Sequence, residues 1–219
     1  MCGRFTVLTP AEIAEAIRAV ELRRRCEPLS HGTTPRPHVR PGGRIAAINA
    51  VFQPVERTWG FEFDWHKGPV FNTRVESLLS ATRTWRDAGR EGRCIIPAAS
   101  FFETHANETV ANPKTGRPMK RAYEFAAPDG TALLLAGVAA QDACSIVTTE
   151  PNGFVAPVHA RMPLTLTPDE AADWLDPSWN DAQLQELWHH LADRSRFGLA
   201  VAPEQLRAAP STDEQLSLF

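Results

Sequence analysis

The sequence predicts an α+β fold, a single domain with a β-rich, barrel-like centre of antiparallel sheets flanked by several helices. Two capping boxes, Thr9-Pro10-Ala11-Glu12 and Thr167-Pro168-Asp169-Glu170, place helices near the two ends of the chain. Between them, short apolar segments alternate with turn residues, as is typical of β-strands. The 219 residues contain no internal repeat and no domain linker, so we expect one domain over residues 1–219.

The first part of the chain is expected to alternate between helices and short strands. After the first capping box, Ile13, Ile17 and Val20 recur at helical spacing and give that helix one apolar face. Residues 27–43 are rich in proline, so we expect a loop there. The other expected elements are a strand at 2–8, paired strands at 44–52 and 55–63, and a helix within 72–85 that carries Leu78, Leu79 and Trp85.

The second part is predicted to be β-structure followed by two helices. The expected strands span residues 93–97, 100–104, 121–125, 131–138 and 145–149. The polar segment 105–120 is expected to be a hairpin loop, because Asn112-Pro113 and Thr115-Gly116 supply turn residues. One helix follows Thr167. Another spans 180–192, with a buried face formed by Leu184, Leu187, Trp188 and Leu191.

Composition and charge narrow the possible classes of protein. No stretch approaches the ~20 apolar residues of a membrane helix, and we expect no export signal. The four cysteines lack C-x-x-C spacing, so we expect reduced thiols, a cytoplasmic location and no structural metal. Residues 1–162 hold 20 Lys and Arg against 16 Asp and Glu, whereas residues 163–219 hold 3 against 10. This distribution permits a nucleic-acid partner without requiring one.

Met1-Cys2-Gly3-Arg4-Phe5 has the most distinctive chemistry. A methionine before a small residue is a substrate for initiator removal, so we expect Cys2 to become the first residue. Its α-amine, with a pKa of roughly 8, and its thiol are then two nucleophiles on one carbon frame. The amine can condense with an aldehyde to an imine, which the thiol closes to a thiazolidine ring. By itself, however, a cysteine at position 2 is usually incidental.

Three other segments carry side chains that fit such chemistry. Asn72 and Arg74 are two residues apart, and so lie on one side of an extended segment. Glu103 ends an apolar run, and His159 and Arg161 are again two residues apart. Each also has a purely structural interpretation: a helix cap for the asparagine, solvated charges for Arg74 and the glutamate, and a packed side chain for the histidine.

Together these segments resemble the SOS response-associated peptidase (SRAP) family, whose members attach covalently to abasic sites in single-stranded DNA. The resemblance covers residues 1–166, and residues 167–219 are a divergent, helical and acidic part of the same domain. Five blocks occur in the family's order: Met1 to Phe5, Trp59-Gly60, Asn72 to Ser77, Cys94 to Glu103, and Thr148 to Leu166 with His159-Ala160-Arg161-Met162-Pro163 at its centre.

The resemblance implies a sensor of abasic sites in single-stranded DNA that acts in the DNA damage response. Such a protein forms a thiazolidine crosslink through a cysteine exposed by removal of Met1, and it combines peptidase activity on its own N-terminus with lyase-like Schiff-base chemistry. The implied catalytic residues are Cys2 as the crosslinking residue, Asn72 as its holder, Glu103 as the proton-transferring carboxylate and His159 as the acid–base partner. The implied DNA-binding residues are Arg4, Arg74, Arg161 and Thr148. No cofactor or metal is implied, and we expect a monomer.

Two further observations concern the surface that would meet DNA. Trp59 and Trp65 are candidates for stacking on a base. The chain also departs from the family's pattern. Pro37-His38-Val39-Arg40-Pro41 stands where asparagine-x-alanine-proline is frequent, Ala98-Ala99-Ser100 replaces alanine-aspartate-glycine, and Thr104 replaces an aromatic residue. These changes retain the catalytic residues but alter the expected DNA groove.

Two other functions remain open at this stage. N-terminal-nucleophile amidotransferases also begin Met-Cys-Gly, but they need an oxyanion-forming Asn-Gly pair. Asn152-Gly153 is the only such pair here, and because it follows Pro151 it is expected to form a turn. A non-covalent single-stranded DNA-binding module would use the same basic and aromatic residues without forming a bond. Glutamine hydrolysis would identify the first alternative, and the absence of denaturation-resistant adducts would identify the second.

Overall fold

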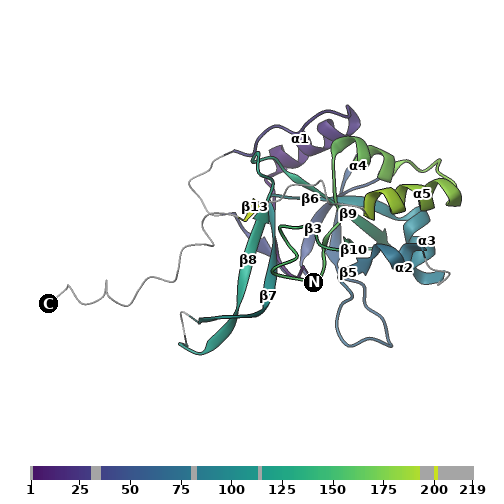
Figure 1. Cartoon of the computed structure of the whole chain (residues 1–219). Helices are drawn as coiled ribbons and strands as arrows, with labels where there is room; N and C mark the ends of the chain where they lie inside the picture. Colours follow the sequence, from purple (N-terminus) through teal and green to yellow (C-terminus); the bar gives the residue numbers. More distant parts are fainter. Residues whose placement is uncertain (1, 31–35, 80–82, 113–114, 193–199, 202–219) are drawn as a thin grey trace.

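A closed barrel of five strands lies at the centre of the fold (Figure 1). The computed structural model describes residues 2–30, 36–79, 83–112, 115–192 and 200–201. The ring order is β10, β4, β3, β6, β9, and it closes because β9 pairs back to β10. The barrel strands are β3 (Arg44–Ile48), β4 (Pro54–Trp59), β6 (Arg93–Ala98), β9 (Leu133–Ala140) and β10 (Ala143–Thr149). The expected α+β class with a barrel-like centre is confirmed.

Three short strands extend the barrel sheet: β5 (Asn72–Arg74), β11 (Met162–Pro163) and β12 (Thr165–Leu166). β5 and β4 both run parallel to β10, whereas only antiparallel pairing was expected. Because long segments rather than hairpins separate these strands from β10 in the sequence, parallel pairing is open to them. The pairing of β5 with β10 is important for the site, since it brings Asn72 into the barrel sheet.

A second sheet of five strands has the order β13-β8-β7-β1-β2. Its strands are β1 (Phe5–Thr6), β2 (His38–Val39), β7 (Ser100–Ala111), β8 (Pro118–Ala126) and β13 (Ala200–Val201). β7 and β8 form a hairpin that extends beyond the barrel (Figure 1). The loop expected at 105–120 is therefore wrong: β7 continues to Ala111 and β8 begins at Pro118, and Gly116 between them is in the left-handed region at φ 67°.

The part of the chain that the structure describes has five helices, which pack around the barrel: α1 (Pro10–Glu21), α2 (Val75–Leu79), α3 (Arg83–Glu91), α4 (Pro168–Leu175) and α5 (Asp181–Ala192). Both predicted capping boxes are present. In each, the threonine hydroxyl accepts a hydrogen bond from the backbone amide three residues later. Figure 1 shows α1 beside α4, while α2 lies against α3 and α5. Leu187 of α5 is buried as expected, and the side chains of Leu184, Trp188 and Leu191 lie outside the described residues.

Two hydrophobic clusters form the core. One lies under the helices and includes Val20, Leu78 and Trp174. The other fills the space between the barrel and the five-stranded sheet, where Phe5 and Trp59 meet with ring centroids 4.9 Å apart. This second cluster forms the inner wall of the candidate site.

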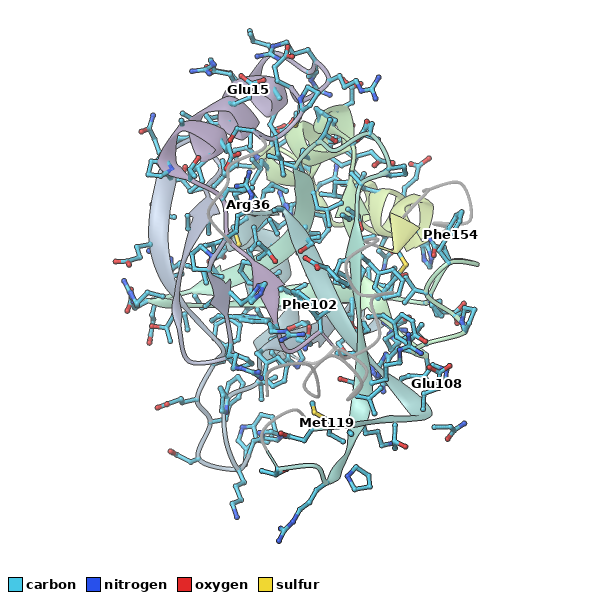
Figure 2. All side chains as sticks on the ribbon, turned by 90° about the vertical axis from the view of Figure 1, so that its left-hand side faces the viewer. Glu15, Arg36, Phe102, Glu108, Met119 and Phe154 are labelled. Atoms are coloured by element: carbon cyan, nitrogen blue, oxygen red, sulfur yellow. The ribbon has the colours of Figure 1, made fainter. Side chains whose placement is uncertain are left out.

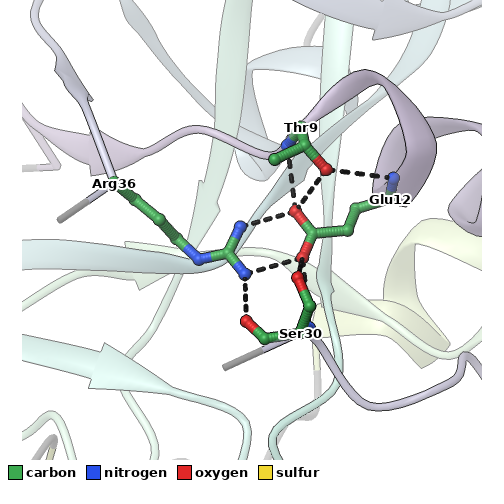
Figure 3. Close-up of polar contacts among 4 residues, drawn as sticks. All are labelled: Thr9, Glu12, Ser30 and Arg36. Atoms are coloured by element: carbon green, nitrogen blue, oxygen red, sulfur yellow. Dashed lines mark hydrogen bonds and ion pairs between the residues drawn. The ribbon is translucent and has the colours of Figure 1, made fainter. Parts of the chain in front are cut away.

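Glu12 ties α1 to the residues just before β2 (Figure 3). Its carboxylate accepts hydrogen bonds from the Thr9 backbone amide (2.9 Å), the Ser30 hydroxyl (3.0 Å) and the Arg36 guanidinium (2.6 Å). The bond from Arg36 holds the pKa of Glu12 well below its usual range, although burial opposes the shift. Glu12 therefore stays ionised, and this ion pair fixes the start of the β2 strand.

Among the described residues, no helix is long and apolar enough to span a membrane.

Candidate active site

Cys2 lies at the junction of the two sheets and is fully buried. Asn72, the first residue of β5, donates a hydrogen bond from Nδ2 to the Cys2 carbonyl oxygen (2.9 Å). The pairing of β5 with β10, in which Asn72 aligns with Ile146, places this amide at the barrel edge. The Asn72 Oδ1 atom is buried and accepts no hydrogen bond in the described part of the chain. Asn72 thus holds residue 2 and leaves one acceptor for another group.

The Cys2 thiol is in an environment that keeps it protonated. Its sulfur lies 3.5 Å from the Arg4 carbonyl oxygen, to which it donates. Burial raises the pKa of the thiol to about 12, and the negative charge of Glu103 adds to the rise. At neutral pH the thiol therefore reacts only when a nearby base removes its proton.

Glu103 is the buried carboxyl of the site, with only 1% of its surface exposed. It belongs to β7 and pairs in register with Tyr123 of β8, so the second sheet fixes its backbone. Burial raises its pKa to about 7, well above the ordinary value of 4.5. The group therefore exists as both acid and base near neutral pH, which suits proton transfer.

His159 completes a carboxyl–imidazole pair. Its Nδ1 atom lies 3.7 Å from Glu103 Oε2, and it is also 3.0 Å from the Arg161 carbonyl oxygen and 3.1 Å from the Arg161 amide nitrogen. Burial lowers the pKa of His159, so its neutral form is favoured. Burial thus raises the pKa of the carboxyl and lowers that of the imidazole, so near neutral pH an acid Glu103 can stand beside a neutral His159.

Arg161 stabilises the region next to His159. Its guanidinium makes two 2.8 Å bonds to the Glu76 carboxylate and a 2.7 Å bond to the Thr148 carbonyl oxygen. Burial alone would raise the pKa of Glu76, but the bond from Arg161 and the charges of Arg161 and Arg74 lower it. A phosphate contact by Arg161 would have to compete with this pair. Glu76 was not among the predicted site residues.

Two predicted DNA contacts do not fit the structure. Trp59 is fully buried, and its indole nitrogen donates to the Phe71 carbonyl oxygen (2.9 Å), so its ring cannot stack on a base. Thr148 is also fully buried, with its hydroxyl 3.4 Å from the Thr73 carbonyl oxygen. Both residues stabilise the barrel next to the site instead. Trp65, by contrast, is 70% exposed and stacked on Phe63 with ring centroids 4.7 Å apart.

The other two predicted arginines are accessible. Arg74 is exposed at the end of β5 and makes no ion pair within the described residues. Arg4 is partly exposed and lies over the Phe102 ring, its guanidinium carbon 3.8 Å from the ring centroid. Within the described residues, no group of three or more potential metal-ligating side chains is gathered, here or elsewhere.

The fold and the site define a class of protein. An α+β barrel holds a cysteine next to a carboxyl–imidazole pair, an arrangement able to support nucleophilic and proton-transfer chemistry. The chain matches the SOS response associated peptidase (SRAP) family over residues 1–204, and it belongs to that family. The match extends past residue 166, where the recognisable motifs end.

Similar proteins share most of the chain. Abasic site processing protein YoqW of Bacillus subtilis (strain 168) is 30% identical over 210 residues, covering 85% of this chain and 86% of that protein. Abasic site processing protein YedK of Escherichia coli (strain K12) is 25% identical over 196 residues, covering 85% of each. The crystal structure of a phage-related protein from Bordetella bronchiseptica has the same fold, with a TM-score of 0.67 and 22% identity, and covers 92% of this chain and 94% of that chain.

Proposed function

We propose that this protein processes abasic sites in single-stranded DNA by forming a thiazolidine crosslink through Cys2 after Met1 has been removed. The observation that carries the proposal is the convergence of Cys2, Asn72, Glu103 and His159, which come from four separate segments. Membership of the SRAP family and the names of its relatives support an abasic site as the substrate. We further propose that the domain spans residues 1–219 and acts as a cytoplasmic monomer without a cofactor.

The first step opens the sugar. An abasic deoxyribose is mostly a closed hemiacetal, and its C1′–O4′ bond must break to give the reactive aldehyde. Glu103 in its acid form donates a proton to O4′, while neutral His159 accepts the proton of the C1′ hydroxyl. Because the pKa of Glu103 is about 7 and that of His159 is lowered, both forms are populated near neutral pH. Such positioned acid–base catalysis contributes typically 10²–10⁴-fold.

The second step joins the protein to the sugar. The α-amine of Cys2 adds to C1′, and the resulting carbinolamine loses one water to give an imine. The amine acts first because the buried thiol is protonated, with a pKa of about 12. The thiol then adds across the C=N bond: sulfur bonds to C1′, and its proton, relayed through the Glu103 carboxylate, reaches the nitrogen. The net reaction is aldehyde plus cysteine to thiazolidine plus water.

Asn72 positions the reacting groups during both steps. Its Nδ2 holds the Cys2 carbonyl, and its buried Oδ1 is placed to accept a hydrogen bond from the amine or from a sugar hydroxyl. Arg74 is exposed beside the site and would bind a phosphate of the strand, and Trp65 offers an exposed ring for a flanking base. Arg161 would reach a phosphate only by giving up part of its bond to Glu76.

The test is the formation of an adduct on a denaturing gel. Protein lacking Met1, incubated with an oligonucleotide that carries one abasic site, should give a species that survives denaturation. Cys2→Ala should lose it, while Cys26→Ala, which removes a different buried thiol, should retain it. Equal adduct yield from Cys2→Ala would refute the proposal.

The amidotransferase alternative receives no support from Asn152. Its side-chain oxygen accepts hydrogen bonds from the amides of Phe154 and Val155 at 3.1 and 3.2 Å, which is the turn expected for Asn152-Gly153. The side-chain oxygen of this asparagine is thus engaged within its own loop. The non-covalent alternative remains an outcome of the gel experiment: binding without adduct would favour it.

A further inference from the structure

Two arginines face each other across the edge of the five-stranded sheet. β1 and β2 are antiparallel, with Phe5 opposite Val39 and Thr6 opposite His38. Continued by one residue, this register sets Arg4 opposite Arg40. Burial lowers the pKa of Arg4, and the charge of Arg40 lowers it further, as expected for neighbouring like charges. Like charges directly opposite in a sheet are destabilising, so this arrangement calls for an anion.

The Phe102 ring lies beneath the Arg4 guanidinium. Phe102 is opposite Arg4 on β7, and its backbone amide donates to the Arg4 carbonyl oxygen (2.9 Å). The Arg4 guanidinium lies over the ring at 3.8 Å, and the His38 ring meets its edge with centroids 4.9 Å apart. Figure 2 labels Phe102 on the face of the molecule turned to the viewer. Stacking on the ring holds the guanidinium flat and leaves its N–H edges free for a ligand.

The positive charge here is not neutralised by the protein. Neither Arg4 nor Arg40 has an ion-pair partner in the described part of the chain. The charge of Glu124 on β8 acts on both Arg4 and His38. Its Oε1 atom already accepts hydrogen bonds from the hydroxyls of Ser100 and Thr6. One engaged carboxylate therefore faces Arg4 and His38.

We propose that Arg40 and His38, which lie in a segment that departs from the family pattern, join Arg4 in binding one backbone phosphate of the DNA strand, on the face of the sheet opposite the Phe5 core. Two guanidinium forks match the oxygens of a phosphate, and the bound anion would relieve the repulsion between them. Arg4 is two residues from Cys2, a chain distance of at most about 7 Å. The phosphate therefore belongs to a nucleotide close to the lesion, so the inference rests on the proposed function.

The fold holds this site in place. Arg40 precedes Pro41, which favours an extended backbone at residue 40 and so continues the β2 register. On the other side of β2, the pair of Arg36 with Glu12 anchors the strand to α1 (Figure 3). A hydrogen bond from the Gly43 amide to the Arg40 carbonyl oxygen (3.0 Å) closes the turn that begins at Arg40 and fixes its backbone.

The test compares Arg40→Ala with Arg18→Ala, measured on an undamaged single-stranded oligonucleotide across salt concentrations. Arg18 is a matched control, because it is exposed on α1 and pairs with Glu15, which Figure 2 labels near the top of the molecule and away from Phe102. Arg40→Ala should weaken binding about fivefold at low salt and reduce the slope of log affinity against log salt by about 0.7. Arg18→Ala should leave both unchanged. Wild-type affinity and slope for Arg40→Ala would overturn the proposal.

Two additional arms identify the anion. Oligonucleotides with and without a 5′-terminal phosphate should show the same loss on Arg40→Ala, as expected for a backbone phosphate. A loss confined to the phosphorylated oligonucleotide would overturn that choice in favour of a terminal phosphate.

His38 faces Arg4, Arg40 and Glu124, and burial and the Arg4 charge lower its pKa. A bound phosphate would raise that pKa, so affinity should increase as pH falls from 8 to 6, and His38→Asn should abolish the increase.

The proposal of a phosphate site and the proposal of a Cys2 crosslink can be tested separately. Affinity for undamaged DNA depends on the phosphate site and not on Cys2. In crosslinking, Arg40→Ala should slow adduct formation at low concentrations of abasic DNA in proportion to its loss of affinity. If Cys2→Ala still crosslinks while Arg40→Ala loses affinity, the crosslinking proposal fails and the phosphate site stands.

Discussion

Replacing Glu103 by glutamine should stabilise the protein at alkaline pH and not at acid pH. Only 1% of this residue is exposed, and its pKa is raised from 4.5 to about 7. The folded state thus binds this proton more tightly than the unfolded chain. The stabilisation that results is fully present below about pH 4.5 and is lost as pH rises through about 7.

The size of the effect follows from the shift. The difference of about 2.5 pKa units between 4.5 and about 7 corresponds to about 3 kcal/mol, which the ionised carboxylate costs the wild-type protein at pH 8. Glu103→Gln keeps the shape of the side chain but cannot ionise, so it avoids this cost. Because the glutamate of the unfolded chain is already mostly ionised at pH 5, about 2.5 kcal/mol of this cost develops between pH 5 and pH 8, and the gain at pH 8 relative to pH 5 should raise the melting temperature by about 5 to 10 °C.

The assay is thermal unfolding at pH 5 and pH 8, followed by circular dichroism. Any constant cost of fitting the amide, about 1–3 kcal/mol if one of its hydrogen bonds is unsatisfied, cancels in the comparison of the two pH values. Glu108→Gln is the control on the same strand. Its carboxylate is half exposed, and a bond from Tyr123 lowers its pKa, so its removal should give no gain at pH 8. An equal effect of Glu103→Gln at both pH values would refute the reasoning.

Three further comparisons, with five substitutions, separate chemistry, DNA binding and stability. Glu103→Gln and His159→Ala should each slow adduct formation at least tenfold in single-turnover crosslinking and change its pH profile, with DNA affinity unchanged; losses of affinity in proportion to rate would contradict this. Arg74→Ala should reduce the slope of log DNA affinity against log salt by about 0.7. Arg161→Ala should mainly lower the melting temperature, because its guanidinium bonds to Glu76 and Thr148. The reverse pattern would contradict these bonds. Trp59→Phe should cost about 1–3 kcal/mol in denaturant unfolding without changing affinity, whereas a weaker DNA complex would restore a stacking role.

Local signals in the sequence predicted the parts of the fold that depend on neighbouring residues. The capping boxes at Thr9 and Thr167 form as expected, because each is complete within four residues. The barrel strands β6, β9 and β10 were also predicted, since buried apolar runs bounded by turns identify them. The closure of the barrel by β9 and β10 depends on contacts between strands, which no single segment encodes.

The errors have physical reasons. The β7–β8 hairpin was expected to be a loop beyond Thr104, because residues 105–111 are mostly polar and show no alternation between a wet and a dry face. Trp59 was expected to contact DNA. It belongs to the barrel and packs against Phe5 of the other sheet, so its burial depends on how the two sheets pack. Composition alone cannot tell a buried indole from an exposed one.

The site was predicted residue by residue only because of the family resemblance. Cys2, Asn72, Glu103 and His159 are far apart in the sequence, and nothing in their spacing brings them together. Glu76 was missed, because its partner Arg161 lies 85 residues away, and a surface acid after a strand gives no signal of an ion pair. Arg40 and His38 were noted as departures from the family pattern, and only the β1–β2 register shows that they face Arg4 and Thr6.

The central claim is that Cys2 bonds to the abasic sugar through both its amine and its thiol. The most direct measurement is mass spectrometry of the N-terminal peptide, after reaction with abasic single-stranded DNA and digestion of protein and DNA. The predicted peptide begins at Cys2 without Met1, carries the sugar with the loss of one water, and has the same mass with or without borohydride treatment, because a thiazolidine has no C=N bond to reduce. A peptide that gains two hydrogens on treatment, keeps Met1, or carries the sugar on a lysine would contradict the claim.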